Sequence, residues 1–90
     1  MYQVIRYIAN KPINYNGEQL RAVGSVQYSR EDKTIAEQIL NKLYDISANQ
    51  KKMVIIKRTR YTFRCENAAH KYYFKIIKEK KDKKLEDIYI

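Results

Sequence analysis

The chain has 90 residues, a length that fits one domain with a small hydrophobic core. Hydrophobic residues make up 44% of it, Gly and Pro are scarce, and the formal net charge is +9, which is typical of a basic globular protein. No apolar run approaches the roughly 18 residues that a membrane-spanning helix requires, so no membrane association is expected. The single cysteine, Cys65, excludes an internal disulfide framework and favours a reducing, cytoplasmic location.

The positive charge is concentrated in the second half of the chain. Residues 1–50 hold six Lys/Arg and five Asp/Glu, a net charge of +1, whereas residues 51–90 hold thirteen and five, a net charge of +8. Charge distributed so unevenly favours association with phosphate backbones or acidic protein surfaces, although it also serves solubility alone.

Two strands are predicted before the helix. Residues 2–8 are rich in β-branched and aromatic side chains, and residues 20–28 alternate between apolar and polar positions. Between them, Pro12 and the pair Asn16-Gly17 interrupt regular structure. Asn-Gly is typical of a tight hairpin turn because both residues tolerate positive φ, so these features predict an antiparallel hairpin.

One amphipathic helix is predicted within residues 29–50. Ser29 is a suitable N-cap, and Asp32, three residues later, has the spacing of a capping box. Apolar residues recur at intervals of three and four and predict a stripe that faces the core, formed by Ile35, Ala36, Ile39, Leu40, Leu43 and Ile46.

The second half of the chain changes to a period of two. This alternation predicts one strand over residues 53–65 and another over 71–78, joined by a turn as an antiparallel hairpin. A helix over residues 69–85 is the competing interpretation, because the end of the chain is rich in helix formers. The expected fold is α+β, a single domain over residues 1–79 in the order β-β-α-β-β, with one helix on one face of an antiparallel sheet. Residues 80–90 are expected to form a charged tail, helical or frayed, whose last apolar residues are able to dock onto the domain or onto a partner.

The stretch "KRTRYTFR", residues 57–64, carries the candidate site. In a continuous strand its three arginines would project from one face, and the partner strand would add two lysines and a tyrosine on the side away from the helix. Arginine binds phosphate bidentately, lysine supplies a point charge, and tyrosine offers a stacking surface for bases. The alternative is a cationic sheet face that only resists aggregation. The predicted nucleic-acid-binding residues are Arg58, Arg60, Arg64, Lys71, Tyr73 and Lys75.

Enzymatic chemistry finds little support in the sequence. His70 is the only histidine, so a His–His metal pair is excluded, and the chain has no glycine-rich phosphate loop. A Cys65–His70 nucleophile pair would need an accessible thiol, whereas the alternation places Cys65 on the core face. We therefore expect no catalytic residues, no metal site and no cofactor.

The order of the elements resembles that of small phage-encoded proteins. The segments that carry this likeness are "YQVIRYI", "AVGSVQY", "SREDKTIAEQIL", "KMVIIKR" and "KYYFKIIK". Host-takeover and anti-CRISPR-type proteins are similar to this chain in size and build and lack catalytic residues. The Lys-, Ile-, Asn- and Tyr-rich composition also fits an AT-rich viral genome. The resemblance implies a stoichiometric inhibitor that blocks a host nucleoprotein in the host cytoplasm.

Two functions follow from these features. The leading one is a small binding protein whose basic hairpin engages nucleic acid or the nucleic-acid channel of a ribonucleoprotein. The second is a protein-interaction module, an inhibitor or adaptor, that meets an acidic protein surface through exposed tyrosines and the closing segment "LEDIYI". Either would act as a monomer or, if exposed strand edges pair, as a homodimer.

Overall fold

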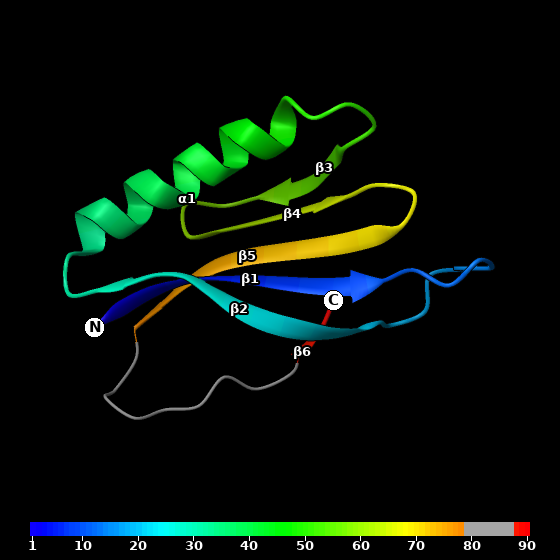
Figure 1. The fold of residues 1–90 in the computed structure, drawn as a ribbon, viewed down its shortest axis with the longest axis horizontal. Helices are drawn as coiled ribbons and strands as arrows, with labels where there is room; N and C mark the ends of the chain where they lie inside the picture. Colours follow the sequence, from blue (N-terminus) through cyan, green and yellow to red (C-terminus); the bar gives the residue numbers. More distant parts are fainter. Residues whose placement is uncertain (79–87) are drawn as a thin grey trace.

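A computed structural model describes residues 1–78 and 88–90 of the chain. Within these residues it contains one helix and one antiparallel sheet of six strands in the order β3-β4-β5-β1-β2-β6 (Figure 1). The α+β class predicted from the sequence is therefore confirmed. The elements are β1 (Tyr2–Asn10), β2 (Arg21–Arg30), α1 (Lys33–Ala48), β3 (Val54–Arg58), β4 (Thr62–Glu66), β5 (His70–Lys78) and β6 (Ile88–Tyr89).

The structure has four strands after the helix, whereas the sequence predicted two. The single strand expected over residues 53–65 is two strands, β3 and β4, which pair with each other across a turn at residues 59–61. The expected strand over 71–78 is β5, and β6 adds a short pair, Ala22 with Ile88 and Arg21 with Tyr89. The end of the chain thus docks onto β2, which is one of the two placements considered from the sequence. The predicted tail helix falls mostly on residues outside the described ones.

Strand β1 lies at the centre of the sheet, between β2 and β5. The sequence of β1 has apolar residues at consecutive positions, so both of its faces are able to pack against other side chains. Its antiparallel pairing with β5 runs from Tyr2 opposite Lys78 to Asn10 opposite His70. This pairing brings the basic second half of the chain beside its first strand.

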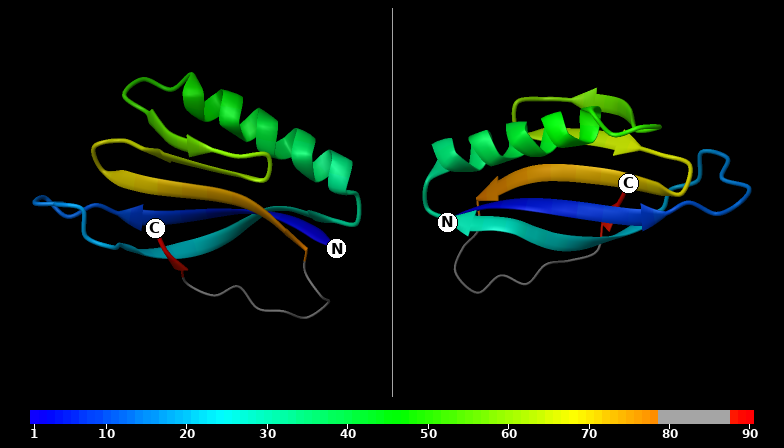
Figure 2. Two further views of the ribbon diagram at one scale, coloured as in Figure 1. Left: turned by 180° about the vertical axis from the view of Figure 1, so that it is seen from behind. Right: turned by 45° about the horizontal axis from the view of Figure 1, so that its top comes forward.

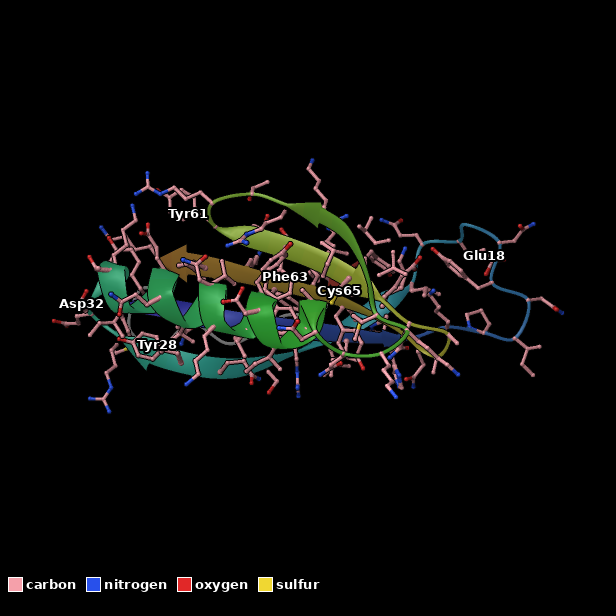
Figure 3. All side chains as sticks on the ribbon, turned by 90° about the horizontal axis from the view of Figure 1, so that it is seen from above. Glu18, Tyr28, Asp32, Tyr61, Phe63 and Cys65 are labelled. Carbon is pink, nitrogen blue, oxygen red and sulfur yellow. The ribbon has the colours of Figure 1, made fainter. Side chains whose placement is uncertain are left out.

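The helix covers one face of the twisted sheet, where it contacts β1, β2, β4 and β5 (Figure 2). The buried residues of this face form a helix-side core of Val4, Ala36, Leu40, Phe63, Cys65 and Phe74. The rings of Phe63 and Phe74 stack with 4.3 Å between centroids, and Tyr44 of the helix meets Phe63 edge-on at 5.5 Å. Figure 3 shows Phe63 and Cys65 beside the helix. Two residues of the predicted stripe, Ile35 and Ile46, are exposed instead.

The helix begins later than the sequence suggested. Its N-cap is Asp32, which lies at the start of the helix (Figure 3). The Asp32 Oδ1 atom accepts hydrogen bonds from the backbone N–H groups of Thr34 at 2.9 Å and Ile35 at 3.2 Å. Ser29, the predicted N-cap, belongs to β2 and pairs with Gln3 of β1. The pairing with β1 extends β2 beyond the point where local capping rules would end it.

The hairpin between β1 and β2 has a long connection. Residues 11–20 join the two strands, so the tight two-residue turn expected at Asn16-Gly17 does not form. Gly17 still has a positive φ of 77°, which is the conformation that the Asn-Gly pair indicated. The connection carries Tyr15 and Leu20, which pack against the other face of the sheet.

That second face, away from the helix, is also partly apolar. Its buried residues are Ile5, Tyr7, Ala9, Leu20 and Ala22, and the partly buried residues packed against them include Tyr73, Ile77, Ile88 and Ile90. The sheet therefore separates two small clusters instead of one core and one fully solvated face.

Candidate functional site

The stretch at residues 57–64 forms a hairpin turn rather than a continuous strand. The backbone N–H of Thr59 donates to the carbonyl oxygen of Thr62 at 2.8 Å, and the hydroxyl oxygens of the two threonines lie 2.6 Å apart. Arg58 ends β3, Arg60 lies in the turn, and Arg64 lies within β4. The prediction that these three arginines project from one face is therefore wrong.

Two of the three arginines lie on the helix side of the sheet. Arg58 donates from Nη2 to Oδ1 of Asn41 at 2.6 Å, and its guanidinium carbon lies 3.8 Å from the ring centroid of Tyr44. Arg60 Nε lies 3.5 Å from Oε1 of Glu37, an ion pair without hydrogen-bond geometry. Both contacts tie the arginines to the helix and separate them from the predicted site.

The remaining four predicted residues do lie together, on the face away from the helix. In the pairing of β4 with β5, Arg64 is opposite Tyr73, Thr62 is opposite Lys75, and Glu66 is opposite Lys71. Residues paired directly in an antiparallel sheet project from the same face. Arg64, Lys71, Tyr73 and Lys75 therefore share one surface, as the alternation predicted for them.

Lys57 joins this surface, although strict alternation from Ile55 would place it on the helix side of the sheet. The pairing of β3 with β4 skips Ile56, so that Ile55 is opposite Cys65 and Lys57 is opposite Arg64. Such a bulge inserts one extra residue and shifts the alternation after it. The sequence signal for this shift was that a lysine follows Met53 and Ile55 at alternate positions.

One row of side chains crosses five strands on this face. From β3 to β2 it consists of Lys57, Arg64, Tyr73, Tyr7 and Gly24, each opposite the next in the registers of the sheet. The guanidinium carbon of Arg64 lies 4.4 Å from the ring centroid of Tyr73, within the range of a cation–π contact. The Tyr73 and Tyr7 rings lie 6.0 Å apart, at an interplanar angle of 39°.

Gly24 makes room for the inner end of this row. A Cβ atom at position 24 would lie 2.8 Å from Cε1 of Tyr7, closer than real contacts allow. The Tyr7 ring is only 3% exposed and so has little freedom to move away. A glycine opposite Tyr7 thus leaves room for the ring against β2, and the ammonium group of Lys75 lies 5.6 Å from the ring centroid.

Lys57, Arg64, Tyr73 and Lys75 define what we call the basic face. Within the described residues, none of its three cations forms an ion pair with a carboxylate. Tyr7 is too buried to serve as a platform for a ligand, and Tyr73 lies beneath Arg64. The outward plane of the Arg64 guanidinium is therefore the group of this face best placed to meet a base or a phosphate.

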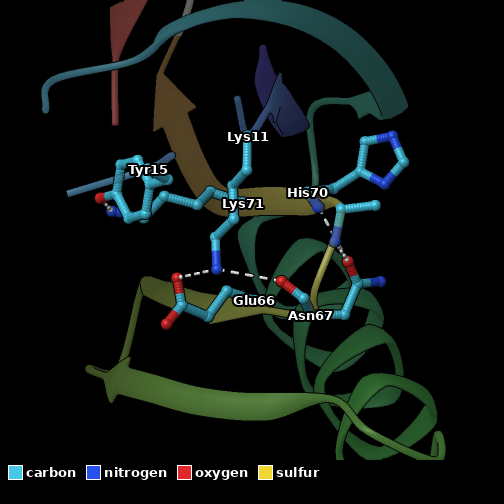
Figure 4. A network of polar contacts seen from close by, with 7 residues as sticks. Lys11, Tyr15, Glu66, Asn67, His70 and Lys71 are labelled. Carbon is cyan, nitrogen blue, oxygen red and sulfur yellow. Dashed lines mark hydrogen bonds and ion pairs between the residues drawn. The ribbon is translucent and has the colours of Figure 1, made fainter. Parts of the chain in front are cut away.

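A polar network occupies one end of the same side of the sheet (Figure 4). Lys11 Nζ lies 2.7 Å from Oε2 of Glu66 and donates to the carbonyl oxygen of Asn67 at 3.0 Å. Lys71 donates to the hydroxyl of Tyr15 at 2.7 Å. Lys71, a predicted binding residue, therefore holds the β1–β2 connection against β5, and Glu66 offsets positive charge at this end.

The thiol of the sequence is buried, and the histidine lies at the start of a strand. Cys65 is buried beneath the helix, and burial raises the pKa of its thiol to about 11, although a hydrogen bond with the Ser47 side chain acts in the opposite direction. His70 begins β5, and its ring lies 5.8 Å from that of Tyr72. Among the described residues, no group of three or more His, Cys, Asp or Glu is placed to hold a metal ion.

No protein-family model, no curated protein and no solved structure matches this chain. In the part of the chain that the structure describes, no helix is long and apolar enough to cross a membrane.

Proposed function

We propose that this chain is a small non-enzymatic binding protein that engages nucleic acid, free or within a nucleoprotein, through its basic face. The observation that carries the proposal is the row in which Arg64, stacked on Tyr73, lies between Lys57 on β3 and Tyr7 on β1. Lysine and arginine neutralise backbone phosphates, and arginine also binds phosphate with two parallel hydrogen bonds.

The stack on Tyr73 favours this role because it orients the guanidinium before a ligand arrives. An arginine held against an aromatic ring loses less side-chain freedom on binding than one that moves freely in solvent. The net charge of +8 over residues 51–90 adds a long-range attraction to polyanions, which increases the rate of association.

The salt dependence of binding tests the proposal. Labelled duplex and single-stranded oligonucleotides are titrated with the protein at several salt concentrations, with fluorescence anisotropy as the readout. Three phosphate contacts, from Lys57, Arg64 and Lys75, predict a slope of about −2.7 for the logarithm of the association constant against that of salt on duplex DNA. No binding to any oligonucleotide at low salt would contradict the proposal.

A matched pair of variants locates the contact. Lys57→Ala/Arg64→Ala/Lys75→Ala removes three charges from the basic face, and Lys42→Ala/Lys51→Ala/Arg60→Ala removes three exposed charges elsewhere. We expect the first variant to lose most of the salt dependence and the second to keep it, because each phosphate contact contributes about one unit of slope. Equal losses in both variants would mean that binding follows net charge and not this face.

The second candidate function, a protein-interaction module, has support at the edge of the sheet. Strand β3 lies at one edge of the sheet, and Val54 and Ile56 on it are 58% and 52% exposed. An apolar strand edge invites pairing with a strand of another chain, either a protein partner or a second copy of this one. An inhibitor of the phage type inferred from the sequence would use this edge, the basic face or both.

Nuclease treatment and sedimentation separate these possibilities. A partner retained after nuclease digestion, and lost on Val54→Lys/Ile56→Lys but not on the Lys57/Arg64/Lys75 substitutions, favours the interaction module. Sedimentation of the purified chain at several concentrations identifies a homodimer. Loss of partner binding on nuclease treatment alone favours the nucleic-acid function.

A further inference from the structure

A pocket of about 160 Å³ lies on the helix side of the sheet, opposite the basic face. Its apolar wall comes from Leu43 and Ile46 of the helix, Met53 of the following loop and Phe74 of β5. For comparison, a dry apolar cavity of about 150 Å³ in another protein holds one benzene molecule. The pocket therefore has the volume for the hydrocarbon part of a small molecule.

Arg6 supplies the one charged side chain among the residues that line this pocket, whose polar lining also includes Gln27, Ser47 and Gln50. It lies on β1 opposite Phe74 of β5 and Ser25 of β2, so its side chain projects toward the helix. Its Nε atom is buried without a hydrogen-bond partner, and among residues 1–78 and 88–90 the guanidinium forms no ion pair. Arginine stays charged in proteins, and a buried donor without an acceptor is destabilising. An anionic acceptor in the pocket would remove this cost.

A bulge on β2 adds a polar group to the same pocket. Tyr28 is opposite Val4 and Val26 is opposite Ile5, so Gln27 between them has no partner on β1. Its side-chain amide donates to the carbonyl oxygen and hydroxyl of Ser25 at 3.3 and 3.2 Å and lines the pocket beside Arg6. Bulged residues commonly re-aim a side chain toward a functional site.

We propose that this pocket binds a small monocarboxylic acid whose body is an aromatic ring or a hydrocarbon of similar size. The carboxylate accepts two hydrogen bonds from the Arg6 guanidinium, the geometry in which arginine binds carboxylates most strongly. The body of the ligand packs against Leu43, Ile46, Met53 and Phe74, and the flexible Met53 side chain adapts to its shape. This site is independent of the basic face and holds whether or not the chain binds nucleic acid.

Benzoate is the probe for this proposal, and benzyl alcohol is its neutral counterpart of similar size. Each is titrated into isotope-labelled protein, and the amide and methyl chemical shifts are followed by NMR. We expect saturable shifts at Arg6, Leu43 and Met53 with benzoate, and binding of benzyl alcohol weaker by about tenfold or more, because it lacks the charge-assisted hydrogen bonds.

Three variants complete the test. Arg6→Met keeps an unbranched side chain without the charge, and Ile46→Trp fills the rim from a position that is 51% exposed and is expected to leave the fold intact. Both should abolish the shifts, whereas Arg60→Met, which removes an arginine outside the pocket, should leave benzoate binding unchanged. The proposal is overturned if benzoate produces no saturable shift, if its shifts map to the basic face, or if both probes bind equally well.

Discussion

Two bulged residues, Ile56 on β3 and Gln27 on β2, decide where the charged side chains of this protein point. Each is an extra residue relative to its partner strand, so the alternation of faces shifts by one position beyond it. At Ile56 the shift moves Lys57 onto the basic face beside Arg64. At Gln27 it places an amide beside Arg6. The surfaces of this molecule thus depend on single residues, and a strict period of two assigns their neighbours to the wrong face.

At the same scale, the burial of Cys65 predicts a thiol that resists modification. Because its pKa is raised to about 11, the thiolate is scarce, and a disulfide reagent at about pH 8 should react far more slowly with the folded protein than with the denatured chain. Absorbance of the released thiol measures both rates. A folded protein that reacts as fast as the denatured one would contradict the buried position.

The same raised pKa links stability to pH. Between the ordinary value of 9.0 and about 11 the folded state keeps the proton that the unfolded state has lost, so the free energy of unfolding falls as pH rises through this range. Comparison with Cys65→Ala isolates the contribution of the thiol to this pH dependence. We expect the variant to show a smaller decrease over this range in urea unfolding experiments.

At the scale of elements, long-range pairing prevails over local signals wherever the two compete. Ser29 satisfies the rules for an N-cap, but the ladder between β1 and β2 continues through Arg30 and delays the helix to Asp32 and Lys33. In the same way, the alternation across residues 57–64 indicated one long strand, but antiparallel pairing folds it back at residues 59–61. Pairing with a neighbouring strand stabilises a segment through contacts with residues outside it, and the intrinsic propensity of the segment does not include these contacts.

The position of the N-cap gives a prediction for the helix. Asp32→Ala removes the acceptor for the N–H groups of Thr34 and Ile35 and should lower the free energy of unfolding by about 1 kcal/mol. Glu31→Ala makes the same change in charge at an exposed neighbour and should cost much less. Urea unfolding followed by circular dichroism measures the free energy of unfolding of both variants. Equal decreases for the two variants would contradict the assignment of Asp32 as the N-cap.

At the scale of the whole molecule, stability rests on two small clusters, one on each side of a single sheet. A chain of 90 residues has a free energy of unfolding of about 5 to 13 kcal/mol by size alone. The Phe63 ring links the helix to the sheet, because it stacks on Phe74 of β5 and receives the edge of Tyr44 from α1. We therefore expect a large share of the free energy of unfolding to depend on the Phe63 side chain.

Truncation of that ring tests its importance for the molecule. Phe63→Ala should lower the free energy of unfolding by about 3 to 5 kcal/mol, because it removes buried apolar area and leaves a cavity. Ile13→Ala, at a fully exposed position of the β1–β2 connection, is the control and should have almost no effect. A loss of less than about 1 kcal/mol for Phe63→Ala would show that the helix-side core does not depend on this contact.

The sequence by itself determined the α+β class, the helix, most of the strands and the concentration of positive charge in residues 51–90, because these follow from periodicity and composition. It also placed Arg64, Lys71, Tyr73 and Lys75 on one face, since regular alternation holds across β4 and β5. Only the tertiary structure decided that Arg58 and Arg60 belong to the helix side, that Lys57 joins the basic face, and that Arg6 lines a pocket. Turns, bulges and the pairing of β1 with β5 depend on contacts between residues far apart in the chain, and local patterns carry no information about such contacts.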